Sequence, residues 1–236
     1  LYGILKADNE CEYADIFIKT QKEAVIKGAK AMRDGVDSVN PTLQMAFCAA
    51  GGYAEFALDI AKILSGENNP IIIRVSNGVY VPIGTKKISY NFYRAATQVL
   101  LLKDEADVIL AEADTIPYNQ YGISTQWYHT HYVGSVLEGV DGAKRWITRL
   151  ITHEPESGLP FRKLLKKYDG FYKELAKLTP MLECKGCKIP LSRKPRFFFG
   201  DIGWDNCIDG GDGWCSHVLE RLGLPVYFSE KEGGAA

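Results

Sequence analysis

Pro70-Ile-Ile-Ile-Arg-Val-Ser76 is a short run dense in β-branched residues, which is typical of a buried strand in a parallel sheet. A second run of the same kind, Asp107-Val-Ile-Leu-Ala-Glu-Ala113, follows roughly 35 residues later, a spacing that leaves room for one crossover helix. Residues 90–103 between them have the composition of that helix. The pair of runs therefore predicts a parallel βαβ unit.

The same alternation extends in both directions from this unit. Further strands are predicted at residues 2–7, 42–50, 143–148 and 224–228. Helices are predicted at residues 13–33, with Gly35 as the stop of the first, and at 53–64, 125–137, 161–178 and 216–222. Repeated βαβ units with right-handed crossovers form either an open doubly wound sheet or a closed barrel.

Two observations favour the barrel. No G-x-G-x-x-G phosphate-binding sequence follows any of the predicted strands, and polar and aromatic residues gather just past the strand ends, where a barrel places its active site. We expect an α/β fold in which residues 1–180 form the carboxyl-terminal half of a (β/α)8 TIM barrel. Its first three strands would then lie upstream of Leu1. Residues 181–236 are predicted to be a linker and the start of a second, Rossmann-like α/β domain.

Composition narrows the class of protein. The 236 residues carry 28 Lys and Arg against 29 Asp and Glu, and 46% of them are hydrophobic, which suits a packed, soluble domain. The near-neutral charge without basic blocks argues against a nucleic acid partner. No apolar run approaches the roughly 20 residues of a membrane-spanning helix. The cellular compartment is left open.

Carboxylates at two strand ends are the candidate catalytic groups. Glu112 ends the apolar strand Val108-Ile-Leu-Ala, and Asp8 and Glu10 end the first predicted strand. Two carboxylates from different strands on one face of a barrel are what glycoside hydrolysis requires. Alternatively, Glu112 is a structural carboxylate paired with Arg74 or Arg145, and the acidic cluster is a helix cap or turn.

The order of these motifs resembles that in clan A glycoside hydrolases. Those enzymes have an Asn-Glu pair at the end of one barrel strand, a second carboxylate three strands later and a Trp on the last strand. The segments Ile109-Leu-Ala-Glu-Ala-Asp-Thr-Ile-Pro117, Gln126-Trp-Tyr-His-Thr-His131 and Asp141-Gly-Ala-Lys-Arg-Trp146 are similar to the seventh and eighth units of family 42 β-galactosidases and their relatives. The stretch from Trp214 to Val226 looks like the opening of their trimerisation domain.

The resemblance implies a retaining mechanism on a β-linked galactoside or related sugar, without a catalytic cofactor. Glu112 would be the nucleophile and Glu10 the acid/base, with Asp8 as the competing acid. A homo-oligomer, trimer or dimer, is implied for the full-length protein. The candidate sugar-binding residues are Trp146, Asn77, Tyr80 and Tyr118. The alternative for Trp146 is core packing, which is the more frequent role of a lone Trp on a strand. His129 and His131 lie two apart on a predicted helix, so they face different sides and form no metal pair.

Four cysteines cluster late in the chain, at Cys184, Cys187, Cys207 and Cys215. The C-x2-C start is typical of a structural zinc site, although the second pair is seven residues apart, and free thiols or disulfides are the alternatives. Two other functions stay open beside the glycosidase. One is a catalytically inactive carbohydrate-binding or assembly protein on a barrel, and the other is a metal-dependent barrel hydrolase or lyase.

Overall fold

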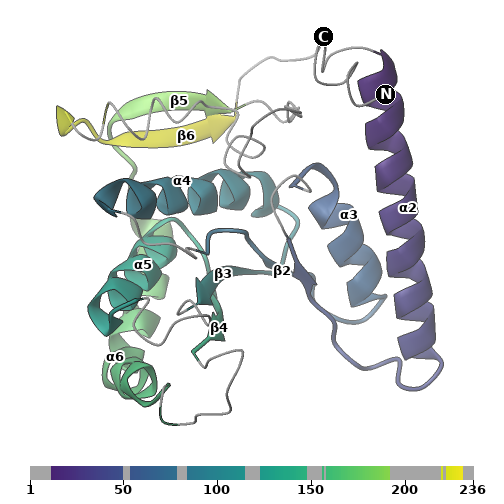
Figure 1. The fold of residues 1–236 in the computed structure, drawn as a ribbon, viewed down its shortest axis with the longest axis horizontal. Helices are drawn as coiled ribbons and strands as arrows, with labels where there is room; N and C mark the ends of the chain where they lie inside the picture. Colours follow the sequence, from purple (N-terminus) through teal and green to yellow (C-terminus); the bar gives the residue numbers. More distant parts are fainter. Residues whose placement is uncertain are drawn as a thin grey trace.

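The computed structural model describes residues 12–49, 54–78, 84–114, 123–147, 156, 158–191, 219 and 222–230. Within these residues, helices alternate with short strands (Figure 1). The helices are α2 (Glu12–Asp37), α3 (Ala54–Ser65), α4 (Gly84–Leu102), α5 (Thr125–Leu137), α6 (Leu159–Leu178) and the 3-10 helix η1 (Thr179–Met181). The strands are β1 (Phe47–Cys48), β2 (Ile72–Arg74), β3 (Val108–Asp114), β4 (Gly142–Trp146), β5 (Cys187–Leu191) and β6 (Val226–Glu230).

Strands β1 to β4 form one parallel sheet in the order of the sequence, which confirms the predicted α/β class. Each strand pairs with the strand that precedes it in the chain, and a helix connects every pair. The register places Arg74 of β2 beside Leu110 of β3, and Glu112 of β3 beside Lys144 of β4. The described sheet therefore advances in one direction without a reversal of strand order.

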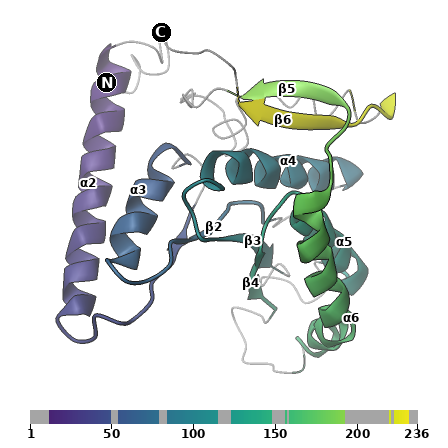
Figure 2. The same cartoon turned by 180° about the vertical axis from the view of Figure 1, so that it is seen from behind.

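The helices α3 to α6 cover one face of this sheet. Side chains alternate along a strand, and Ile73, Val75, Ile109 and Ala111 belong to the same apolar cluster as residues of all four helices. Figures 1 and 2 show α3 and α4 near β2, with α5 and α6 near β3 and β4. The main hydrophobic core thus lies between the sheet and these helices.

The intervening strand residues point to the opposite face. There the register brings together Arg74, Leu110, Glu112, Lys144 and Trp146 from three adjacent strands. Most of these side chains are charged or aromatic, whereas the helix-covered face is apolar. The polar face is the part of the sheet on which the candidate site is built.

The predicted elements agree with the observed ones in position, with differences at their ends. Helix α2 continues past Gly35 to Asp37, because Arg33 pairs with Asp37 one turn later and Gly35 is accommodated inside the helix. Strand β1 shortens to Phe47–Cys48. The predicted strand at residues 2–7 lies outside the described residues, as does nearly all of the predicted helix at 216–222. In the described part of the chain, no helix combines the length and apolarity needed to cross a membrane.

Strand β5 was not predicted from the sequence. It pairs in parallel with β6, and the ladder begins where the Cys187 amide donates to the Pro225 carbonyl at 2.8 Å. Strand β6 lies next to α4 (Figure 2). The rings of Tyr93 on α4 and Phe228 on β6 meet there edge to face. Residues 181–236 are still a predicted second-domain segment, but their described part packs against a helix of the first.

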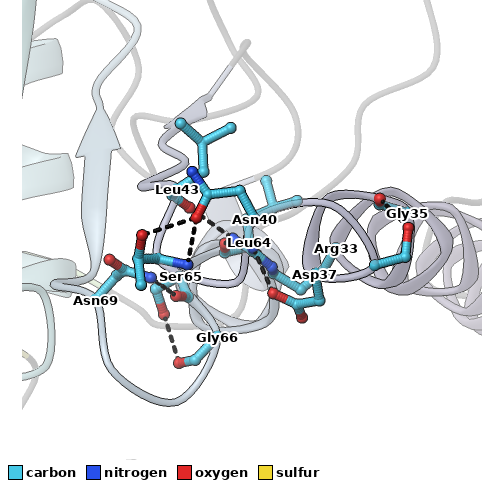
Figure 3. Close-up of polar contacts among 11 residues, drawn as sticks. Arg33, Gly35, Asp37, Asn40, Leu43, Leu64, Ser65, Gly66 and Asn69 are labelled. Carbon is cyan, nitrogen blue, oxygen red and sulfur yellow. Dashed lines mark hydrogen bonds and ion pairs between the residues drawn. The ribbon is translucent and has the colours of Figure 1, made fainter.

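A buried arginine ties the last turns of α2 and α3 to each other. The Arg33 side chain donates to the carbonyls of Leu43 (2.9 Å) and Leu64 (3.1 Å) and to Asp37 (2.5 Å), and only 4% of Arg33 is exposed. Figure 3 shows these groups converging from the end of α2, the following loop and the end of α3. Arg33 therefore satisfies one carbonyl in the last turn of α3 and one carbonyl of the loop after α2.

Replacing Arg33 by Met is expected to lower the free energy of unfolding by about 2–4 kcal/mol, because two carbonyls lose their charged donor. Urea unfolding followed by circular dichroism measures the change. Lys30→Met is the matched control on the exposed face of α2, with an expected change within about 0.5 kcal/mol. Equal stability of the two variants would contradict a stabilising role for Arg33.

Candidate functional site

Glu112 is the buried carboxylate at the centre of the polar face. It lies near the carboxyl end of β3, and only 5% of the residue is exposed. Strand alternation turns its side chain away from the helix-covered face, since Ala111 and Ala113 on either side of it pack in the apolar clusters. Burying a charge without partners is costly, so its contacts determine what this position can do.

Two donors hold the Glu112 carboxylate from strand β2 and the residues after it. Arg74 Nη1 lies 2.6 Å from Glu112 Oε2, and the Gly78 amide donates to the same oxygen at 3.2 Å. The side chains of Arg74 and Glu112 are only 12% and 6% exposed. This ion pair balances the buried charge and fixes the orientation of the carboxylate.

Gly78 is in close contact with the same carboxyl group. A Cβ at position 78 would lie 2.6 Å from Glu112 Cδ, which is closer than real Cβ contacts allow. Only glycine leaves this space to the carboxylate. The backbone at the end of β2 therefore forms one wall of the site.

Asn77 positions the main chain of β3 from the same segment. Its Oδ1 accepts the Glu112 amide hydrogen at 2.8 Å, and its Nδ2 donates to Ser135 Oγ at 2.9 Å. Asn77 is fully buried, at 0% exposed. The sequence suggested a sugar-binding role, but the structure directs this amide to the protein itself, continuing the β2–β3 pairing beyond the end of β2.

His131 of α5 reaches the same segment from the helix side. Its Nε2 lies 2.9 Å from the Asn77 carbonyl oxygen, and its ring stacks on Trp127 and Phe92 at centroid distances of 5.3 and 6.2 Å. Because a carbonyl oxygen only accepts, Nε2 carries the hydrogen. Burial lowers the pKa of His131 to about 4, since desolvation disfavours the charged ring.

His129 faces a different neighbour, as its spacing from His131 predicts. Its Nδ1 lies 2.8 Å from the Tyr172 hydroxyl of α6, where the ring also packs against Tyr168. The two histidines therefore have separate roles, and His129 belongs to the contact between α5 and α6.

Lys144 and Trp146 complete the polar face from β4. Lys144 lies opposite Glu112 in the strand register, but its Nζ extends along the strand to lie 5.1 Å from the centroid of the Trp146 ring. Trp146 is opposite Asp114, which is only 4% exposed. Trp146 is thus on the same face as Glu112, with Lys144 against one side of its ring.

The structure brings together three of the predicted site residues, namely Glu112, Asn77 and Trp146. Asp8, Glu10, Tyr80, Tyr118, Cys207 and Cys215 lie outside the described residues. Cys184 and Cys187 are free and exposed, and the described residues contain no cluster of three or more His, Cys, Asp or Glu side chains that could hold a metal ion. The four-cysteine zinc site stays a prediction.

Lys144 and Ser135 were not identified from the sequence as part of the candidate site. Lys144 has a signal in the sequence, because it lies two residues before Trp146 and alternation places both on one strand face. Ser135 has no such signal, because its contact with Asn77 joins a helix to a strand end 58 residues away. Arg74 was predicted only as one of two possible partners of Glu112.

Comparison with family models, with curated proteins and with solved structures finds no match for this chain. Its function is therefore argued from the site.

The low pKa of His131 predicts a pH-dependent stability. The unfolded chain binds a proton at this residue below its ordinary pKa of 6.5, whereas the folded chain excludes it until about 4. Stability is therefore lost as the pH falls through this window, by about 2 kcal/mol between pH of about 7 and about 5.

Urea unfolding of the native chain, His131→Gln and His129→Gln at both pH values measures this loss. His131→Gln should remove the extra loss because glutamine does not titrate, while His129→Gln should keep it. An identical pH dependence in all three proteins would contradict the assignment to His131.

Proposed function

We propose that this chain is part of a retaining glycoside hydrolase that acts on a β-linked galactoside or related sugar, with Glu112 as the nucleophile. The observation that supports it most is the placement of Glu112 near the carboxyl end of a parallel strand, buried and held by Arg74 and the Gly78 amide. The resemblance of the β3, α5 and β4 sequences to family 42 β-galactosidases points to the same residue.

The sheet order supports a barrel as the setting of the site. An open doubly wound sheet reverses its strand order and places helices on both faces, whereas a barrel advances strand by strand with helices outside. The described strands β1 to β4 advance in one direction with α3 to α6 on a single face. On this proposal, the polar face with Glu112 lines the interior of a (β/α)8 barrel.

The proposed reaction has two steps. Glu112 attacks the anomeric carbon and forms a glycosyl ester while the glycosidic bond breaks, and a second carboxylic acid protonates the departing oxygen. Water then cleaves the ester, giving its proton to the second carboxylate. Glu10, or Asp8 in its place, is proposed as that acid/base, at roughly 5–5.5 Å from Glu112 as retaining enzymes require. Arg74 and Gly78 orient the nucleophile, and Trp146 offers an apolar ring face to the sugar.

One observation favours a second candidate, a catalytically inactive carbohydrate-binding protein on the same scaffold. Arg74 and Gly78 both contact Oε2 of Glu112, as expected for a carboxylate whose task is to fix the sheet. In that case Lys144 and Trp146 would contribute to sugar binding, and Glu112 would serve structure alone.

A fluorinated sugar separates the two candidates. A β-galactosyl fluoride with fluorine in place of the hydroxyl beside the anomeric carbon needs no acid to release its leaving group. It therefore reports on the nucleophile alone, whichever residue is the acid/base. We expect intact-protein mass spectrometry to show one added fluorosugar, located by peptide mapping at Glu112. Glu112→Gln should abolish labelling, while Glu105→Gln, at an exposed ion pair with Lys62, should label normally.

Rescue by azide gives an independent test of the same assignment. In Glu112→Ala, azide can occupy the space of the missing carboxylate and attack the anomeric carbon of a nitrophenyl β-galactoside, releasing nitrophenolate. The expected product is a glycosyl azide of inverted configuration. A native protein that binds galactosides without being labelled, together with no azide product, would refute the hydrolase and support the binding protein.

A further inference from the structure

The peptide group between Asn77 and Gly78 has a partner at each of its two ends. Its carbonyl oxygen accepts from His131 Nε2 at 2.9 Å, and its N–H donates to Glu112 Oε2 at 3.2 Å. The described residues contain no cis peptide, so the C=O and N–H of this group point in opposite directions. A single planar unit therefore connects the ring of His131 to the carboxylate of Glu112.

We propose that His131 is a positioning residue for Glu112 and acts through this peptide group. The inference rests on the proposed function, in that it assigns His131 a part in holding the nucleophile. By fixing the direction of the Asn77 carbonyl, His131 also fixes the direction of the Gly78 N–H. Hydrogen bonds in series polarise one another, so the His131 bond also strengthens the donor that contacts Glu112.

The surroundings of His131 keep its ring uncharged and in an orientation in which Nε2 donates a hydrogen bond. The ring is 2% exposed and lies between Trp127 and Phe92, whose planes are inclined to it by 11° and 23°. This packing restrains the rotation of the imidazole, and the low pKa keeps it uncharged in the neutral range. The neutral ring donates one hydrogen bond, to the Asn77 carbonyl.

A second set of hydrogen bonds holds the same segment against rotation. Ser135 Oγ accepts from Asn77 Nδ2 and donates to the His131 carbonyl at 2.8 Å, while Asn77 Oδ1 receives the Glu112 amide. Asn77 and Ser135 are both fully buried. The side chain of Asn77 thus holds the backbone amide of Glu112. The backbone carbonyl of Asn77 is held by His131, which fixes the direction of the Gly78 N–H that donates to the Glu112 side chain.

The decisive experiment combines enzyme kinetics with hydrogen exchange in the full-length protein of which this chain is proposed to be part. His131→Leu removes the donor and keeps an apolar side chain, His131→Gln retains a donor, and His129→Leu is the control on the same helix. We expect His131→Leu to lower kcat for a nitrophenyl β-galactoside by up to about 100-fold with little change in KM, because the nucleophile is displaced rather than the sugar site. His131→Gln should recover part of kcat, and His129→Leu should leave it near the native value.

Amide exchange measured by NMR tests the positioning without relying on turnover. The Gly78 amide should exchange faster in His131→Leu than in the native chain and His129→Leu, while core amides such as that of Ile109 keep their protection. A folded His131→Leu protein with native Gly78 protection would overturn the proposal, and so would native kcat in that variant.

The two proposals fail in different ways. If the native full-length protein is not labelled by the fluorosugar, the hydrolase is refuted, and loss of Gly78 protection in His131→Leu still supports the positioning of Glu112. If labelling at Glu112 occurs at the native rate in His131→Leu, the hydrolase stands and the positioning role of His131 is overturned.

Discussion

The ion pair between Arg74 and Glu112 is the constraint around which the sheet is arranged. A buried carboxylate needs a partner within hydrogen-bonding distance, and here that partner comes from the adjacent strand, which fixes the register of β2 against β3. The same requirement explains Gly78, since the carboxylate occupies the space that any larger residue would fill. Asn77 then continues the pairing of β3 where β2 has ended, by accepting the Glu112 amide hydrogen. Residues 74–78 thus hold both the side chain and the backbone of Glu112.

Much of the fold follows from local patterns in the sequence. The strands around Ile73 and Ile109 are predicted by β-branched density. Helix α5 is predicted with its observed ends, and the structure adds that the Ser124 side chain caps its first turn by accepting from the Trp127 amide. Strand β5 escaped prediction because it is only five residues long, contains Pro190 and begins at the second cysteine of a C-x2-C pair, which points to a turn or a metal site. Its pairing with β6 depends on residues some 40 positions away in the chain, which no local pattern encodes.

Some residues of the candidate site could likewise be predicted from the sequence, and others could not. Glu112 was predicted as a site residue because a carboxylate at the end of an apolar strand stands out in the sequence. Arg74 was predicted as one of its two possible ion-pair partners. The roles of Asn77, His131 and Ser135 depend on the distance and direction between a helix and a strand end. Residue types can suggest that a histidine or an asparagine is polar and buried. Only the tertiary arrangement shows that His131 bonds the Asn77 carbonyl and that the Asn77 side chain accepts the Glu112 amide hydrogen.

The order of the strands also bears on how the chain acquires its structure. In the four-stranded sheet, every strand pairs with the strand that immediately precedes it, so each new pairing closes a loop of one helix and two short connections. The entropy cost of closing such loops is modest and similar at every step. Parallel pairing is slow to form because each crossover must close before two strands can pair, but the sequential order allows successive βα units to join a growing sheet as a ribosome releases them.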